Sequence, residues 1–304
     1  MTLARLQQFT TCSLIAIAAL WAWLAVTSGH SGWALGAALL TVFGYAVVLG
    51  AEFCLVRVLH GGDPSPRPTL RQLAAAWWAE ARAAPRVFCW QQPFRSQRWP
   101  DHVPTDTSSV GLRGVVLLHG FICNRGFWNG WMAEMSARGI PYVAVNLEPV
   151  FGSIEAYKGA IEQAVARMEA CTGRPPLVVA HSMGGLAFRH WYAAQTDPMR
   201  IERALTMGTP HRGTWLARYA FSTNGRQMRQ GSRWLVDLQQ RESAAQRSRF
   251  VCFYSHCDNI VFPASNATLP DAVNIHLEAV AHVDMASHPA PWRALMNLLD
   301  GKPV

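Results

Sequence analysis

The sequence has few lysines and few acidic residues. Only Lys158 and Lys302 are lysine, and 19 of the 304 residues are Asp or Glu, so the net charge of +8 comes almost wholly from scattered arginines. No dense basic run and no basic segment interleaved with aromatic residues occurs, which argues against a nucleic-acid partner. A membrane surface with anionic headgroups is the partner that this charge favours.

Cysteine pairs and phosphate loops are also lacking. The seven cysteines form an odd, scattered set without a Cys-x-x-Cys pair, which argues against a disulfide framework and favours reduced thiols. His and Cys do not cluster at metal-ligand spacing, and the segment GTPHRGT (208–214) has no lysine where a phosphate-binding loop needs one. We therefore expect neither a metal nor a cofactor.

Long apolar runs are present at the amino terminus. Residues 9–27 (FTTCSLIAIAALWAWLAVT) and 32–56 each reach the length of about twenty residues that crosses a bilayer as a helix. The link SGHS (28–31) suits a tight hairpin, so residues 1–60 are predicted to form an anchor of two transmembrane helices. A cleaved signal peptide is the alternative for the first run, because Arg5 precedes it.

The positive charges around these two runs predict their orientation. Arg5 precedes the first run and the link carries no positive charge. Several arginines follow the second run: Arg57, Arg67, Arg71, Arg82 and Arg86. By the positive-inside rule, both ends of the hairpin and the domain that follows face the cytoplasm.

Residues 61–110 are expected to hold a linker, an amphipathic helix and the first strands. The helix is predicted at 68–85 (PTLRQLAAAWWAEARAAP). Its apolar face is expected to contain Leu70, Leu73, Ala74, Trp77 and Ala81, with Arg71, Glu80 and Arg82 elsewhere. Such a helix either lies in the membrane interface, with Trp77 and Trp78 at headgroup level, or packs on the following domain.

Residues 111–304 alternate strand and helix patterns. Unbroken apolar runs occur at 114–120, 140–149, 176–182, 203–210 and 249–256, and segments of helical period lie between them. Strands of this kind form a mostly parallel sheet with helices on both faces. Ligands of such sheets bind at the carboxyl ends of the strands.

The segment VVAHSMGG (178–185) carries a candidate nucleophile. Ser182 falls where a buried strand becomes a helix, within Ala-x-Ser-x-Gly, and the tight turn there needs small residues such as Ala180 and Gly184. The turn would expose the hydroxyl at the positive end of a helix, where the N–H of Met183 can face an oxyanion. A strand-turn-helix with an incidental serine is the alternative reading of this motif.

A catalytic serine needs a histidine base that is held by a carboxylate, and in this architecture they follow in the order Ser, Asp, His. Asp258 is the first carboxylate after a late strand, and His282 follows the run 272–280. Asp271 and Asp284 remain as alternative acids and His288 as an alternative base. His181 is expected to pack locally.

A second oxyanion donor is expected in the loop after the first strand, LLHGF (117–121). Gly120 allows a sharp turn, and the N–H of Phe121 can face the site. We expect His119 to brace this loop, and Trp128 to line the acyl pocket or to pack beneath it.

Taken together, these motifs resemble bacterial lipases of the α/β-hydrolase superfamily. LLHGF, VVAHSMGG, GTPHRGT, YSHCDNIVFP and VAHVDM occur in the order and approximate spacing of that family, over about residues 114–299. The resemblance implies an α/β-hydrolase fold with Ser182 as nucleophile, His282 as base and Asp258 as acid. It also implies an oxyanion hole made by Phe121 and Met183. Ala180 stands where the commonest family pattern has glycine.

The superfamily carries a cap where this chain has an insert at about 211–248. The insert mixes arginines with apolar residues such as Trp215, which would line an acyl channel while the arginines meet phosphate or carboxylate headgroups. A solvated pair of basic helices is the alternative.

The expected function is therefore a serine hydrolase that cleaves carboxylic esters of lipid-like substrates through an acyl-enzyme on Ser182. An acyltransferase or thioesterase on the same triad is the alternative, and a binding module without turnover is a further one. The expected location is a bacterial inner membrane, with the catalytic domain at residues 111–304 facing the cytoplasm.

Overall fold

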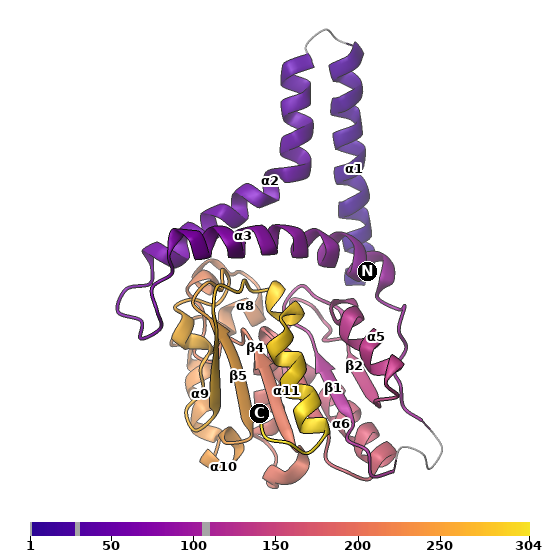
Figure 1. Cartoon of the computed structure of the whole chain (residues 1–304), viewed down its shortest axis with the longest axis vertical. Coiled ribbons are helices and arrows are strands. Elements are labelled where there is room, and N and C mark those ends of the chain that lie inside the picture. Colours follow the sequence, from indigo (N-terminus) through magenta and orange to yellow (C-terminus); the bar gives the residue numbers. More distant parts are fainter. Residues whose placement is uncertain (1, 28–30, 105–109) are drawn as a thin grey trace.

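Residues 2–27, 31–104 and 110–304 are described by the computed structural model (Figure 1). Two apolar helices, α1 (Leu3–Thr27) and α2 (Ser31–Val58), lie side by side and project from one end of the molecule. Both are long and apolar enough to cross a membrane, and 0% and 11% of their most apolar stretches are buried. A membrane anchor and a signal sequence both have these properties. Apart from Ser31, the expected tight link falls outside the described residues.

The segment after the hairpin is helical. Helix α3 (Leu70–Pro85) begins with a capping box between Thr69 and Gln72, and continues into a π-helical turn, η1 (Arg86–Gln91), and α4 (Gln92–Arg95). The first strands that we expected between 61 and 110 do not form in the described part of that segment. One antiparallel bridge joins His102 to Tyr142, and the flanking prolines at 100 and 104 have no N–H for a longer ladder.

Within the described residues, six parallel strands form the central sheet in the order β2-β1-β3-β4-β5-β6, which confirms the predicted parallel sheet. The strands are β1 (Val115–Leu118), β2 (Tyr142–Val145), β3 (Leu177–His181), β4 (Arg203–Met207), β5 (Phe250–Ser255) and β6 (Val273–Leu277). The register pairs Leu118 of β1 with Ala180 of β3, and His181 of β3 with Met207 of β4. The carboxyl ends of the strands meet at the edge of the sheet that faces α3 (Figure 1).

Helices cover both faces of the sheet. The helical segments around it are η3 (Arg125–Trp128), α5 (Asn129–Ala137), η4 (Ile154–Tyr157), α6 (Lys158–Thr172), α7 (Met183–Tyr192), η5 (Pro198–Arg200), η7 (Ala264–Ala267), η8 (Asp284–Ser287) and α11 (Pro289–Leu299). In β1, Val116 and Leu118 pack into the core that α6 and α7 share, whereas Val115 and Leu117 pack into the core of α5 and α11. Burial on both faces explains why β1 to β5 have predominantly apolar sequences, whereas β6, whose first residues are exposed, contains polar residues.

The insert between β4 and β5 folds as short helices. They are η6 (Trp215–Tyr219), α8 (Thr223–Gln227), α9 (Arg233–Arg241) and α10 (Ala244–Arg247). The amide of the buried Asn224 in α8 donates to the carbonyl of Val150 at 2.7 Å and lies 3.6 Å from the sulfur of Met183. The N–H of Trp215 donates to the carbonyl of Phe262 at 3.0 Å. The insert is thus attached to the start of α7 and to the loop after β5.

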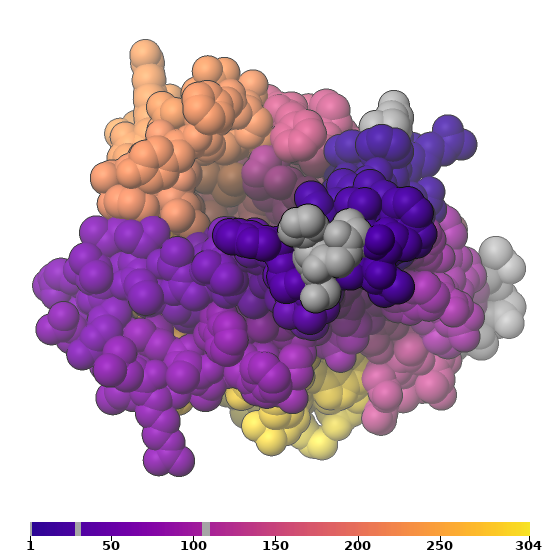
Figure 2. Space-filling model, turned by 90° about the horizontal axis from the view of Figure 1, so that it is seen from above, coloured from indigo at the N-terminus to yellow at the C-terminus, as the bar shows by residue number. Residues whose placement is uncertain are grey.

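Helix α3 packs on the domain with a face that partly matches the one we predicted. Leu73 and Ala81 are buried as expected, whereas Leu70 is exposed and Glu80 is buried. The error arose because Glu80 is polar, and a pattern of hydropathy assigns a carboxylate to the outside of a helix. Seen from the end that carries the hairpin, α2 and α3 (purple) cover much of the domain, and the insert (orange) lies beside them (Figure 2).

A third apolar cluster joins these amino-terminal helices to the loops after the last two strands. Phe53 and Val56 of α2 and Leu73 of α3 are buried there with Phe262 and Ala281. Further along, the indole N–H of Trp77 donates to a carbonyl of α2, that of Ala46, at 2.8 Å. The amino-terminal helices therefore pack against the end of the sheet where the candidate site lies.

Candidate active site

Ser182 occupies a strained turn between β3 and α7. Its φ of 53° and ψ of −128° lie in a region that residues with a side chain rarely adopt. The N–H of Ser182 donates to the carbonyl of Met207 at 2.8 Å, and its own carbonyl accepts from the N–H of Gly185 at 3.0 Å. This is the geometry of a nucleophile elbow, which raises a serine hydroxyl above the end of the sheet.

The close approach of the turn to β1 explains the small residue two positions after the serine. A Cβ on Gly184 would lie 2.4 Å from the carbonyl oxygen of His119, which is closer than any side chain can come. Ala180, two positions before the serine, is fully buried in the sheet. The glycine of the pattern Ala-x-Ser-x-Gly is therefore a packing requirement of this turn.

His282 and Asp258 form a buried pair. Nδ1 of His282 lies 2.9 Å from Oδ2 of Asp258, and the side chains of His282 and Asp258 are 6% and 1% exposed. The other carboxylate oxygen, Oδ1, accepts from the N–H groups of Ile260 and Val261 at 2.9 and 2.8 Å. With Nδ1 donating to this acceptor, Nε2 of His282 is the nitrogen that is free to act as a base.

Two opposing effects determine the pKa of His282. Burial of the ring lowers the pKa, but the charge of Asp258 and its hydrogen bond, together with the charges of Glu80 and Glu52, raise it above the ordinary histidine value. The imidazolium form is thereby stabilised, which is the form that a catalytic base adopts after it takes a proton.

The nucleophile turn and the His-Asp pair meet at the end of β4. The N–H of Ser182 is hydrogen-bonded to the carbonyl of Met207, the last residue of β4. A Cβ on Gly208, which follows Met207, would lie 2.9 Å both from Oδ2 of Asp258 and from Nδ1 of His282. Gly208 has a φ of 54°, so a side chain is disfavoured there by backbone conformation as well as by space. The fold thus brings all three predicted residues to one edge of the sheet.

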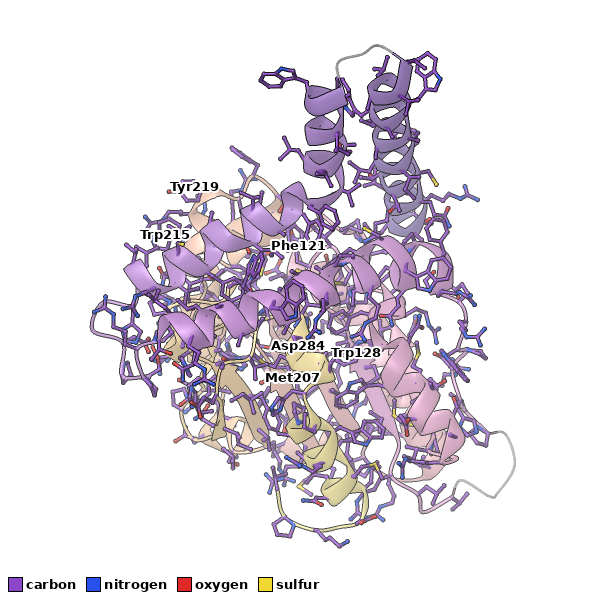
Figure 3. All side chains as sticks on the ribbon, turned by 45° about the horizontal axis from the view of Figure 1, so that its top comes forward. Phe121, Trp128, Met207, Trp215, Tyr219 and Asp284 are labelled. Atoms are coloured by element: carbon purple, nitrogen blue, oxygen red, sulfur yellow. The ribbon has the colours of Figure 1, made fainter. Side chains whose placement is uncertain are left out.

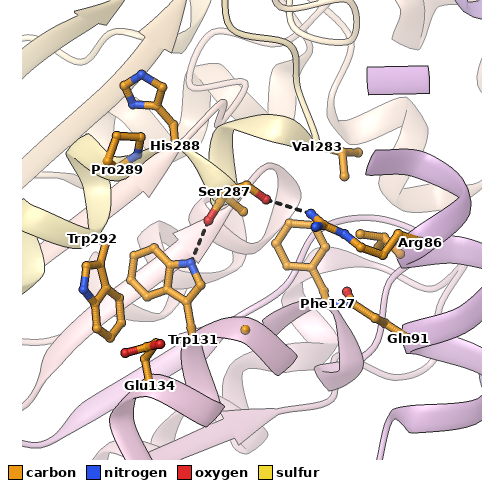
Figure 4. Close-up of a pocket in the computed structure, with 13 residues that line it drawn as sticks. Arg86, Gln91, Phe127, Trp131, Glu134, Val283, Ser287, His288, Pro289 and Trp292 are labelled. Atoms are coloured by element: carbon orange, nitrogen blue, oxygen red, sulfur yellow. Dashed lines mark hydrogen bonds between the residues drawn. The ribbon is translucent and has the colours of Figure 1, made fainter. Parts of the chain in front are cut away.

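The alternative acids and base have other contacts. Asp271 forms an ion pair with Arg247 at 2.7 Å, and Asp284 begins the helical turn η8. His288 caps α11, where its Nδ1 accepts from the N–H of Ala290 at 3.2 Å. His288 also lines a separate cavity of about 440 Å³, in which the indole of Trp131 donates to a carbonyl at 2.7 Å (Figure 4).

His119 links the loop after β1 to the loop after β2. Its Nδ1 donates to the carbonyl of Gly120 at 2.9 Å, and its Nε2 accepts from the N–H of Leu147 at 3.0 Å. Burial lowers the pKa of His119 to about 4, so the ring is neutral at pH 7 and can make both bonds. Phe121, two positions after His119, packs edge-to-face with Phe151 at a centroid distance of 5.8 Å.

The two tryptophans predicted for the substrate pocket lie in different environments. Trp128 is fully buried in the core between Phe127 and Trp131, at centroid distances of 4.9 and 5.5 Å. Trp215 stacks on Phe262 in the cluster that includes α2 and α3. Figure 3 shows Trp215 next to Tyr219 on the insert and Trp128 in a different part of the molecule.

Three residues around His282 were missed in the sequence. The carboxylate of Glu80 in α3 accepts from two backbone N–H groups of the loop that carries His282, and the amide of Asn259 joins this loop to Glu52 of α2. The sequence did hold a signal for Glu52, which is the only charge in its apolar run. No comparable signal marked Glu80 or Asn259.

A metal site is not found in the described part of the chain. Within residues 2–27, 31–104 and 110–304, no group of three or more His, Cys, Asp or Glu side chains is arranged to hold a metal ion. The His-Asp pair is available for proton transfer.

The chain belongs to the alpha/beta hydrolase family, whose sequence profile matches residues 115–299. A triacylglycerol lipase of Burkholderia plantarii is 31% identical over 128 residues, which cover 39% of this chain and 35% of that protein. A triacylglycerol lipase of Pseudarthrobacter phenanthrenivorans is 31% identical over 122 residues, which cover 37% of each chain. The matched part thus spans little more than a third of these curated relatives.

Solved lipase structures share the fold. The Bacillus licheniformis lipase BlEst2 in its mature form superimposes with a TM-score of 0.57 at 16% identity, over 66% of this chain and 97% of that one. Aspergillus fumigatus lipase B gives a TM-score of 0.58 at 17% identity, over 66% of this chain and 56% of that one. The predicted α/β-hydrolase fold is confirmed.

Proposed function

We propose that the protein is a serine hydrolase that cleaves carboxylic ester bonds of lipid-like substrates, as a lipase or carboxylesterase. The observation that carries this proposal is the strained turn at Ser182 on the sheet edge where Asp258 binds Nδ1 of His282 at 2.9 Å. Membership of the alpha/beta hydrolase family and similarity to two triacylglycerol lipases support it.

In the proposed reaction, Nε2 of His282 removes the proton of the Ser182 hydroxyl as Oγ attacks the ester carbonyl carbon. The N–H groups of Met183 and Phe121 donate to the oxyanion of the tetrahedral intermediate. Collapse of the intermediate breaks the bond to the alcohol oxygen, which receives the proton from His282 and leaves an acyl-enzyme. Nε2 of His282 then takes a proton from a water molecule whose oxygen attacks the acyl carbonyl carbon. The bond from this carbon to Oγ of Ser182 breaks, the acid leaves, and Oγ receives the proton from His282.

Exposed aromatic side chains on the insert and on α3 support a lipid-like substrate. The insert carries the exposed aromatic side chains of Tyr219 and Phe221, the latter 90% exposed, and α3 exposes Trp78. Exposed aromatic residues of this kind are favoured at the interface between membrane and water. The exposed arginines of the insert, such as Arg233, would contact anionic headgroups there.

We further propose that residues 1–60 form a retained anchor in a bacterial inner membrane, with the catalytic domain of residues 111–304 on the cytoplasmic side. Contacts of both helices with the domain support an anchor over a signal sequence. Gln7 of α1 donates to the carbonyl of Ile122 at 3.4 Å, and Phe53 of α2 is buried in the third cluster with Phe262 and Ala281. The distribution of arginines around the two helices supports the orientation.

The test is covalent labelling followed by a chain-length profile. Detergent-solubilised protein is treated with a fluorophosphonate probe beside the Ser182→Ala variant, and p-nitrophenyl esters from acetate to palmitate are then hydrolysed. We expect labelling of the wild type only and turnover of the longer esters. Absence of wild-type labelling would contradict the hydrolase, and a strict preference for acetate would contradict the lipid-like substrate.

A further inference from the structure

The loop that carries His282 is bound by a carboxylate from outside the catalytic domain. Glu80 of α3 is only 2% exposed, although its side chain is a carboxyl group. Its Oε1 accepts from the N–H of Val283 at 3.0 Å, and its Oε2 accepts from the N–H groups of Asp284 and Val283, each at 3.1 Å. One side chain therefore binds two consecutive backbone donors directly after the histidine.

The N–H of His282 itself is connected to α2 through a second side chain, that of Asn259. The N–H of His282 donates to Oδ1 of Asn259 at 3.3 Å, and the amide nitrogen of Asn259 donates to Oε2 of Glu52 at 2.7 Å. Asn259 is fully buried and directly follows Asp258 in the chain. The N–H groups of residues 282–284 are thus all hydrogen-bonded. Glu80 of α3 accepts from the last two, and Asn259, which is bound by Glu52 of α2, accepts from the first.

We propose that Glu80 is a positioning residue for His282, and that Glu52 is a second one that acts through Asn259. The amino-terminal helices would then be part of the catalytic machinery. This inference rests on the proposed function, because it assigns the same histidine as the base. A base that sits in a loop needs partners for its backbone to keep the ring in line with the nucleophile. In this chain those partners are Glu80 of α3 and Asn259, which is held in turn by Glu52 of the proposed anchor.

The chemistry of the contact argues against a purely packing role for Glu80. Burial raises the pKa of Glu80 to about 7, while the N–H groups of Val283 and Asp284 and the charge of His282 act in the opposite direction. An apolar residue would avoid this penalty, but it would leave two buried N–H groups unpaired. A carboxylate satisfies both of them.

Glu80 also contributes charge next to His282. The titratable groups that act on His282 are Asp258 in the loop after β5, Glu80 in α3, Glu52 in α2 and His181 at the end of β3. The three carboxylates favour the imidazolium, so the loss of one of them lowers the pKa of His282. A substitution that removes the charge of Glu80 but keeps its volume should therefore move the pH profile.

The experiment compares Glu80→Gln, Glu80→Ala and Glu52→Gln with the wild type as full-length chains in detergent. Glu134→Gln is the matched control, because Glu134 is an exposed carboxylate of α5. The measurements are the rate of fluorophosphonate labelling, kcat and KM on p-nitrophenyl butyrate, the pH profile of kcat/KM, and thermal unfolding. The butyrate ester reports on chemistry at the triad with little contribution from acyl-chain binding.

We expect Glu80→Ala to lower kcat by about 10- to 100-fold while KM changes about twofold at most, because misplacement of a catalytic group affects the chemical step. Glu80→Gln keeps one acceptor, so it should recover part of kcat and move the acid limb of kcat/KM to lower pH. Glu52→Gln, which acts through Asn259, should lower kcat by about 3- to 10-fold. The control should match the wild type.

The outcomes separate this inference from the proposed function. If the wild type is not labelled by the probe, the hydrolase itself is contradicted. If the wild type is labelled and the Glu80 and Glu52 variants keep its kcat and its pH profile, the positioning role is wrong. If kcat of these variants falls only as much as their fraction of folded protein, and the acid limb of kcat/KM does not move, Glu80 and Glu52 have a structural role only. If Glu80→Ala does not fold, the two glutamine variants decide by the same criteria.

Discussion

The ring of His181 packs against the ring of His282 at a centroid distance of 4.6 Å, and Nε2 of His181 lies 3.0 Å from the carbonyl oxygen of His282. His181 directly precedes Ser182, so this contact joins the nucleophile turn to the loop that carries the proposed base. Burial and the charge of His282 hold the pKa of His181 well below its ordinary value. A neutral His181 keeps a proton on Nε2 to donate to that carbonyl.

Replacement of His181 separates this hydrogen bond from ring packing. His181→Phe keeps an aromatic ring between Phe127 and His282 but leaves the buried carbonyl of His282 without its donor, which should reduce the free energy of unfolding by about 1–3 kcal/mol. His181→Ala also opens a cavity and should destabilise the protein further. Thermal unfolding in detergent checks both variants. A melting temperature of His181→Phe equal to that of the wild type would contradict the role of the bond.

The assignment of the base is tested by two histidines that lie six positions apart. His282→Ala should lower kcat/KM by about 10⁴-fold or more, since loss of a triad base has effects of this size. His288→Ala should stay within about twofold of the wild type, because His288 caps α11. Hydrolysis of p-nitrophenyl butyrate measures both. A large loss in His288→Ala with little loss in His282→Ala would reverse the assignment.

Much of the architecture could be predicted because its causes are local. The strands lie between two cores, so they read as unbroken apolar runs, and the turn at Ser182 approaches β1 so closely that Gly184 is required. Asp258 and His282 could be proposed because each follows a strand whose carboxyl end lies at the same edge of the sheet as Ser182.

The contacts of α3 could not be predicted because their cause is remote in sequence. Glu80 accepts from the N–H of Val283, 203 positions away, and nothing near Glu80 indicates that two unpaired N–H groups will meet it. A hydropathy pattern therefore left Glu80 out of the buried face of α3. The prediction of strands between residues 61 and 110 was wrong for a local reason, because the prolines at 100 and 104 limit the pairing around His102 to one bridge.

The acid limb of activity should follow the raised pKa of His282. A base must be unprotonated to act, so kcat/KM should fall as the pH drops through the pKa of His282, which lies above the ordinary value of 6.5. Asp258→Asn removes the charge and the acceptor that raise this pKa, so the acid limb should move to lower pH while kcat falls by about 10³- to 10⁴-fold. The pH profile on p-nitrophenyl butyrate measures both effects. An acid limb that moves to higher pH in Asp258→Asn would contradict the proposed pair.

The orientation of the anchor is tested by reporters fused after Val304. A cytoplasmic domain predicts that a green fluorescent protein fusion fluoresces and that an alkaline phosphatase fusion is inactive in a bacterial host. The reason is the position of the arginines, because Arg5 lies near the start of α1, Arg57 lies in the last turn of α2 and further arginines follow it. Phosphatase activity without fluorescence would place the domain on the opposite side. A fusion after Thr27 is the internal control, because it should give the reverse result.

A buried ion pair attaches the end of the insert to α7, the helix that begins directly after Ser182. Arg189 of α7 donates to Glu242 through Nε at 2.8 Å and Nη2 at 2.5 Å, and through Nη1 to the carbonyl of His211 at 2.9 Å. Both charged side chains are almost fully buried. Removal of one partner leaves an uncompensated charge in the interior, so Glu242→Gln should reduce the free energy of unfolding by about 3–5 kcal/mol.

The matched comparison is Glu134→Gln, which breaks an exposed pair with Arg138 at 3.5 Å. A surface pair of this kind contributes about 0–1 kcal/mol, so thermal unfolding of Glu134→Gln should differ little from that of the wild type. The double variant Arg189→Met with Glu242→Leu removes both charges at similar volume, and it should be more stable than Glu242→Gln. If Glu242→Gln unfolds at the wild-type temperature, the pair does not hold the insert. In that case the packing of Asn224 against Val150 and Met183 would be its main attachment.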